Sequence, residues 1–177
     1  MQELELLFEK ANKKFLLRDT NLILSGVSER CLCGALMLFL HDEIQNSRYQ
    51  QYYVDIEYNR NNGKIKTIFN DKEQVVSITC DIIVHSRGEQ KHQDNLIAIE
   101  MKKSSATAEQ KQNDKYRLQA LTKKTYNDTW SYDGITLPEH VCGYLLGIYY
   151  EINILERYIH IEYYVLGILT KSEKLTF

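Results

Sequence analysis

The sequence has few of the features that mark disordered linkers, zinc knuckles or transmembrane helices. One proline and eight glycines in 177 residues are too few for long disordered linkers. No two of the four cysteines are separated by two residues, so a zinc knuckle is not indicated. No apolar run reaches the roughly 20 residues that a transmembrane helix needs. We interpret all four cysteines as small buried apolar residues, namely Cys31, Cys33, Cys80 and Cys142.

The chain also lacks a large net charge of either sign. The formal net charge of −2 offers no bulk basic footprint for non-specific binding to nucleic acid. The N-terminal residues follow an amphipathic helix pattern, not the charged-then-apolar pattern of a signal peptide. We therefore expect a cytoplasmic protein with no membrane association. The length and the 44% hydrophobic content predict one domain, residues 1–177, with a sizeable core.

Two helices are expected before the first strand. Residues 3–17 place apolar side chains at helical spacing, and we assign an N-terminal helix to residues 1–20. A second helix is expected over residues 27–41, with Ser25 or Ser28 as its N-cap. The broad stripe that we expect to face the core consists of Val27, Cys31, Leu32, Ala35, Leu38 and Phe39.

Glu29 stands in the first turn of this second helix and has two interpretations. It begins a line of side chains that continues through Cys33, Leu36 and Leu40. In one interpretation it is an acid that complements the helix dipole. In the other it is a carboxylate on a largely apolar face, directed inward at a site.

Three strands are expected next. Residues 51–59 alternate cleanly and place Asp55 and Glu57 on one face, which must be either solvated or metal-binding. A second strand is expected from residue 74 to 85. The third, over residues 96–102, is apolar until its charged end, as expected for a central strand covered on both faces.

The rest of the chain predicts a helix and two more strands. The helix is expected over residues 104–124, capped by one of its first serines or by Thr107. Residues 126–139 carry turn residues and predict a loop. Two β-patterned stretches follow, at 141–154 and 158–169, joined as a hairpin.

Three charged residues interrupt these apolar strands at one end of the predicted sheet. Asp81 lies on the second strand, and Glu100 and Lys102 share a face of the third, because side chains alternate along a strand. Two carboxylates on adjacent strands can hold Mg²⁺, with the Met101 carbonyl as a third ligand. Lys102 can orient a nucleophilic water for phosphodiester hydrolysis. An inter-strand salt bridge, or a zinc site near His85 and His92, is the alternative interpretation.

The pattern resembles the PD-(D/E)xK nuclease superfamily. The resemblance rests on Asp81, a short turn, and an apolar strand that ends in Glu100-x-Lys102. It covers roughly residues 25–170, where the order of elements is similar to that family's α-β-β-β-α-β core. Cys80 stands where the family has a proline. The resemblance implies an α/β, restriction-endonuclease-like fold, a mixed central sheet with flanking helices.

The resemblance also implies a function. It points to a nuclease that depends on Mg²⁺ or Mn²⁺ and acts on DNA, with RNA as the alternative substrate. The implied metal site combines Asp81, Glu100 and the Met101 carbonyl with an extra acid, Glu29 or Glu57, while Lys102 orients the water. Contacts to backbone phosphates, which position without specifying sequence, are expected from Lys103, Lys111, Lys115 and Arg117.

Two further expectations concern partners. The chain has little room for a separate recognition domain, so sequence-specific cleavage would need a homodimer or a partner protein. The alternative to an enzyme is a catalytically inactive module that keeps the fold and binds nucleic acid or a protein partner.

Overall fold

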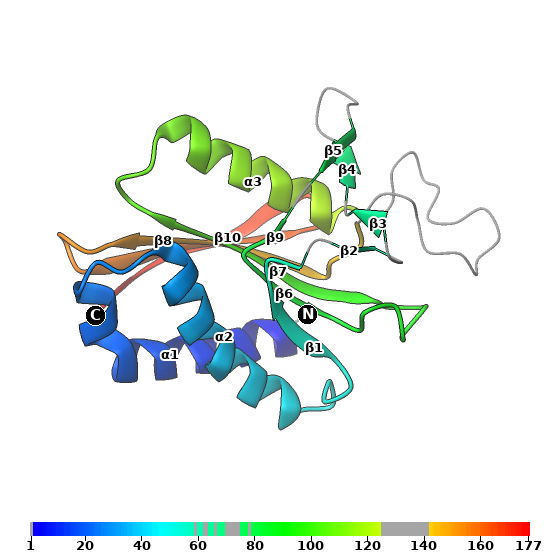
Figure 1. Ribbon diagram of the computed structural model, residues 1–177, viewed down its shortest axis with the longest axis horizontal. Coiled ribbons are helices and arrows are strands. Elements are labelled where there is room, and N and C mark those ends of the chain that lie inside the picture. Colours follow the sequence, from blue (N-terminus) through cyan, green and yellow to red (C-terminus); the bar gives the residue numbers. More distant parts are fainter. Residues whose placement is uncertain are drawn as a thin grey trace.

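The computed structural model describes residues 2–58, 79–124 and 142–177, together with the backbone of four short strands between residues 60 and 77. It is a mixed α/β structure in which a six-stranded sheet lies between α1 and α2 on one face and α3 on the other (Figure 1). The expected loop over residues 126–139 lies outside these ranges. Within them, no helix is long and apolar enough to cross a membrane.

The two N-terminal helices form where the apolar periodicity predicts them. Helix α1 spans Gln2–Leu24 and continues past the predicted end, although the backbone at Asp19 is non-helical, with φ −111° and ψ 19°. Helix α2 spans Glu29–Gln45, and the Ser28 hydroxyl accepts a hydrogen bond from the Cys31 N–H at 3.3 Å. The prediction of Ser28 as N-cap is confirmed.

The predicted stripe of α2 is only partly correct: Leu32 is buried, and Val27, Ala35 and Phe39 are half-buried against the core. Leu38 is 62% exposed and Cys31 is exposed, so the expectation that all four cysteines are buried is wrong for Cys31. The physical reason is that large apolar side chains four residues apart form a continuous ridge. In α2 this ridge consists of Leu32, Leu36, Leu40 and Ile44, and it is buried together with Cys33. Glu29 therefore begins the line of α2 that faces the protein interior.

The central sheet has the order β1-β6-β7-β8-β9-β10. Its strands are β1 (Tyr53–Ile56), β6 (Ile82–His85), β7 (Asn95–Lys103), β8 (Leu146–Asn153), β9 (Tyr158–Val165) and β10 (Ile168–Thr176). Strands β7 and β8 are parallel and are connected through α3 (Ala108–Thr122), whereas the other neighbours are antiparallel. Two short ladders precede β6 in the chain: β2 (Arg60–Asn61) with β3 (Lys64–Ile65), and β4 (Thr67–Phe69) with β5 (Val75–Ser77).

The predicted strand over residues 74–85 is wrong as a single element, because β5 and β6 are separate. Cys80 packs in the layer beneath α3, as does Ile83, whereas Ile82 and Val84 face α1 and α2. Side chains three residues apart cannot share a face of one regular strand. The alternation therefore restarts at Asp81.

Strand β10 was not predicted as a separate element. All nine of its side chains are exposed or half-buried, so it shows no buried apolar face. The turn before it, Leu166-Gly167, has positive φ at both residues but lacks the Asn-Gly or Asp-Gly pair that usually marks such a turn.

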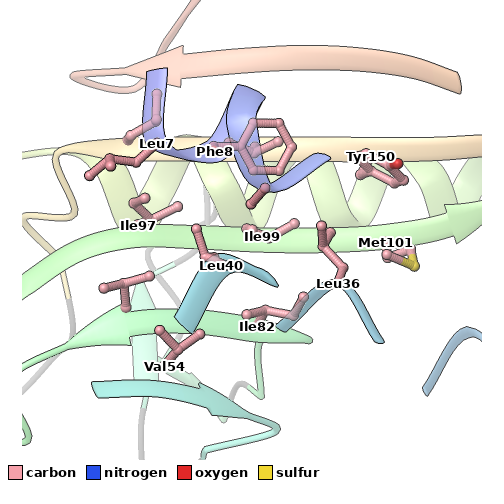
Figure 2. Close-up of a cluster of buried hydrophobic side chains, with 14 of the residues drawn as sticks. Leu7, Phe8, Leu36, Leu40, Val54, Ile82, Ile97, Ile99, Met101 and Tyr150 are labelled. Atoms are coloured by element: carbon pink, nitrogen blue, oxygen red, sulfur yellow. The ribbon is translucent and has the colours of Figure 1, made fainter. Parts of the chain in front are cut away.

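Most of the core lies between the sheet and the first two helices. Phe8 of α1 meets the rings of Tyr150 and Tyr163 edge-on, at centroid distances of 6.2 and 6.1 Å. Figure 2 shows side chains of α1 and α2 together with the apolar side chains of β1, β6, β7 and β8, with Met101 at the far end of β7.

The layer beneath α3 is different, because charge pairs from residues 111–117 of the helix hold it to the sheet. The neighbouring strands β7, β8 and β9 each direct a glutamate toward α3. The pairs are Glu100 with Arg117 at 2.7 Å, Glu151 with Lys111 at 2.8 Å, and Glu162 with Lys115 at 2.7 Å. Apolar contacts beneath α3 come from its second half, chiefly Leu118 and Leu121.

Gly147 of β8 allows α3 to approach the sheet closely. A Cβ at this position would lie 2.9 Å from Cγ2 of Thr122 and 3.3 Å from Cβ of Tyr164. We expect Gly147→Ala to lower the free energy of unfolding by about 1–3 kcal/mol through overpacking, measured by urea denaturation. As a control, Gly34→Ala in α2 meets no atom within 4 Å and should raise stability by up to about 1 kcal/mol. Equal effects of the two substitutions would contradict this account.

Candidate functional site

The candidate site forms where β7 extends beyond β6. The pairing of β6 with β7 stops at Ile99, and no described strand lies beside Met101 and Lys103 on that side. Buried backbone N–H groups need acceptors, and here carboxylates supply them. The Met101 N–H donates to Oδ2 of Asp81 at 2.7 Å, and the Lys103 N–H donates to Oε1 of Glu29 at 2.8 Å.

This arrangement also fixes the direction of a carbonyl. A strand residue directs its N–H and its C=O to the same side. The Met101 C=O therefore points to the side of Asp81 and Glu29. The Glu29 carboxylate reaches β7 and is therefore directed toward the sheet, and its position in the first turn of α2 also suits the helix dipole.

Glu100 and Lys102 both face α3, as the alternation along the strand predicts. The Glu100 side chain is buried, and its Oε1 accepts hydrogen bonds from Arg117 at 2.7 Å and from the Cys80 thiol at 3.3 Å. Lys102 Nζ lies 3.2 Å from Oδ2 of Asp114.

Asp114 joins the two parts of the site. Its Oδ1 lies 3.3 Å from Arg117, and its Oδ2 contacts Lys102, which on its other side lies 3.4 Å from Oε2 of Glu29. Sequence reasoning missed this residue because the lysines and glutamines around it are typical of a solvated helix face. Its spacing of three residues from Arg117, on the helix after Glu100-x-Lys102, is the signal that could have found it.

The site carries more negative than positive charge. Its four carboxylates and two cations are Asp81, Glu100, Asp114 and Glu29 with Lys102 and Arg117. Burial raises the pKa of Asp81, and it raises the pKa of Glu100 to about 8 against the opposing effect of Arg117.

The pKa of Lys102 is also raised, but by its neighbours and not by burial. Burial disfavours the Lys102 ammonium, but Asp114 and Glu29 outweigh burial and raise its pKa. Lys102 is therefore a charged hydrogen-bond donor at neutral pH.

The oxygens of the site fit a hard divalent cation. Within the described ranges, no three His, Cys, Asp or Glu side chains form a metal-binding group by themselves. However, both hydrogen bonds to Glu100 end on Oε1 and the one to Asp81 ends on Oδ2, so one oxygen of each carboxylate accepts none from the described residues. Two such oxygens with the Met101 carbonyl suit Mg²⁺, which keeps several of its waters.

Glu57 does not join this cluster. Its carboxylate forms an ion pair with Arg30 of α2, with 2.8 Å between Nε and Oε1. The acids of β1 and its end thus have cationic partners, because Asp55 likewise contacts Arg87 at 2.6 Å and His85 at 2.9 Å. The Glu57 side chain is therefore paired with Arg30, and its role toward a metal stays a prediction.

The four basic residues expected to contact phosphates all have internal partners. Lys103 Nζ donates to the Gly26 carbonyl at 3.0 Å, and the other three, Lys111, Lys115 and Arg117, pair with the glutamates of β8, β9 and β7. Arg117 contacts the buried Glu100 directly, so the guanidinium group already has a partner within the protein. The role of these four residues toward DNA stays a prediction.

A cavity of about 430 Å³ opens beside Asp81 on the α2 side of the sheet. It is bounded by the start of α2, the end of β1 and the end of β7. The residues that line it are Ser28, Glu29, Arg30, Cys33, Ile56, Glu57, Asp81 and Lys103.

A scan against protein-family models, a search of curated proteins and a search of solved structures found no match to this chain.

The raised pKa of Glu100 predicts a pH-dependent stability. The folded protein holds the Glu100 proton up to about pH 8, whereas an unfolded glutamate releases it near 4.5, so the wild type loses stability as pH rises between these values. Glu100→Gln removes this loss. We expect the wild type to lose roughly 3 kcal/mol relative to Glu100→Gln between pH 5 and 8 without divalent metal, measured by urea denaturation.

Glu151→Gln is the matched control for this measurement. Burial opposes ionisation of Glu151, but Lys111 and Tyr149 outweigh burial and lower its pKa. Its substitution should leave the slope between pH 5 and 8 unchanged. An identical slope in the wild type and Glu100→Gln would show that Glu100 is ionised throughout.

Proposed function

We propose that this chain is a metal-dependent nuclease that hydrolyses phosphodiester bonds in DNA. The observation that supports the proposal is the position of three charged residues at the end of β7: Asp81 accepts from the Met101 N–H, and Glu100 and Lys102 both face α3. We also propose a restriction-endonuclease-like fold. The sequence β1-β6-β7-α3-β8, with β8 parallel to β7, is in keeping with the α-β-β-β-α-β core of the PD-(D/E)xK superfamily.

Asp81 and Glu100, with the Met101 carbonyl, would hold Mg²⁺ or Mn²⁺. When bound, such an ion neutralises phosphate charge and lowers the pKa of a coordinated water. The excess of carboxylates at the site favours its binding, because an added positive charge stabilises Asp81 and Glu100 in their ionised forms. Glu29 adds negative charge to the same site through its contact with Lys102.

Lys102 would act as an electrostatic donor. Its raised pKa keeps it protonated at neutral pH, so it cannot take a proton from water there. Asp114 and Glu29 hold its Nζ from two sides, which restricts where the ammonium can point. It can donate a hydrogen bond to the attacking water and stabilise the negative charge that develops on the phosphate.

One observation favours the second candidate, an inactive module that binds nucleic acid or a protein partner. Arg117 already contacts the buried Glu100, and Asp114 already contacts Lys102. These pairs balance part of the charge that catalysis would use. The two functions differ in whether the site binds a divalent metal and cuts DNA.

Cleavage of plasmid and oligonucleotide DNA with Mg²⁺ tests the first function. Lys102→Ala removes a donor aimed at developing charge, so we expect cleavage to fall by about 10²–10³-fold. Lys171→Ala is the control, because Lys171 also forms a lysine–glutamate ion pair but lies on the edge strand β10, outside the cluster. Equal cleavage by the wild type and Lys102→Ala would refute the assignment.

Metal binding separates the two functions. We expect calorimetry to show one Mn²⁺ site in the wild type and at least a tenfold weaker site in Asp81→Asn, which keeps the shape of the side chain but removes its charge. Asp55→Asn is the matched control, since Asp55 pairs with Arg87 outside the cluster. A wild-type protein without a metal signal would favour the inactive module.

A further inference from the structure

The Arg30–Glu57 ion pair lies at the rim of the cavity beside the proposed active site. Both residues line the cavity together with Asp81 and Lys103. The contact is two-pronged: the Arg30 Nε donates to Oε1 of Glu57 at 2.8 Å, and a terminal guanidinium nitrogen donates to Oε2. Arginine binds phosphate with this same planar fork.

The backbone of Glu57 is in an unusual conformation. Its φ of 49° lies in the left-handed region, which residues with a side chain adopt uncommonly. Its N–H donates to the carbonyl of Asp81 at 3.2 Å, so one residue contacts both the candidate site and the arginine. An outlier of this kind at the rim of a cavity points to a functional constraint.

The pair is also easy to exchange. The Arg30 and Glu57 side chains are 70% and 38% exposed, and exposed ion pairs contribute little to stability. A phosphate group presents two oxygens to the guanidinium in the same way as a carboxylate. An incoming phosphate can therefore replace Glu57 on Arg30 without disturbing the core.

We propose that Glu57 occupies the place of a DNA backbone phosphate. When a single strand enters the cavity, a phosphate next to the scissile one displaces the carboxylate and takes its two hydrogen bonds from Arg30. The cavity of about 430 Å³ is within the size range of sites that hold a small ligand, which suits one nucleotide unit of such a strand. This proposal rests on the proposed nuclease function and adds the contact that anchors the substrate strand.

Binding of a fluorescent single-stranded oligodeoxynucleotide tests the proposal. Anisotropy is measured in Ca²⁺ in place of Mg²⁺, with the length of the oligonucleotide checked afterwards. We expect Arg30→Gln to weaken binding about tenfold, as loss of a charge-assisted hydrogen bond predicts. Glu57→Gln should tighten binding several-fold, because it removes the competing carboxylate. In the double variant, the Glu57 substitution should have no further effect on affinity, because the Arg30 guanidinium for which Glu57 and the phosphate compete is absent.

The Arg48–Glu3 pair provides the matched control. It is also an exposed arginine–glutamate pair, with side chains 67% and 39% exposed, and it does not line the cavity. Arg48→Gln and Glu3→Gln make the same changes in net charge and should alter affinity less than about twofold, as expected for a site without a phosphate contact. Equal effects at the two pairs would show an effect of bulk charge only and would overturn the proposal.

A competition arm separates a strand contact from a general anion site. Inorganic phosphate should displace the oligonucleotide only at concentrations far above those of unlabelled oligonucleotide. Equal competition, or no oligonucleotide binding by the wild type, would overturn the proposal. Cleavage is recorded separately: binding that depends on Arg30 in a protein that never cleaves DNA would refute the nuclease function but support the phosphate contact. Cleavage without dependence on Arg30 would refute the contact alone.

Discussion

The N–H groups of Met101 and Lys103 need acceptors after β6 has ended, and the site is built around that need. Water or another strand could accept these hydrogen bonds elsewhere in a protein. Here Asp81 and Glu29 accept them, which draws two carboxylates to the edge of one strand. The same requirement fixes the start of α2 against β7 and the backbone before β6. An acidic site therefore follows from ordinary backbone hydrogen bonding.

The face of β7 that packs beneath α3 has a second constraint, the burial of Glu100. A buried carboxylate is unfavourable without partners, and Arg117 and the Cys80 thiol provide them. Asp114 then satisfies Arg117 and Lys102 together. The two faces meet at Lys102, which contacts Glu29 from one side and Asp114 from the other. A change in the charge of Glu29 or of Asp114 therefore alters the electrostatic environment of Lys102, which contacts both.

The sequence predicts the elements better than it predicts the partners. Alternation places Glu100 and Lys102 on one face of β7, and the Ser28 cap marks the start of α2, because both depend on neighbours in the chain. Asp114 and the pairing of Glu57 with Arg30 depend on contacts between distant segments, which no local pattern records. The break at Asp81 was missed because β5 and β6 are both apolar, so their alternation reads as continuous. Strand β10 was missed because most of its side chains remain exposed.

The way in which α3 is attached has a consequence for its motion. Charged side chains of residues 111–117 hold it to the sheet, and its apolar anchors lie in residues 118–122. Segments with few buried apolar contacts open at lower free energy than the global unfolding reaction. Residues 108–114 therefore open more readily than residues 118–122, and salt, which screens the charge pairs, favours that opening. Each such opening separates Asp114 from Lys102, so it controls how often solvent reaches the Lys102 ammonium from that face.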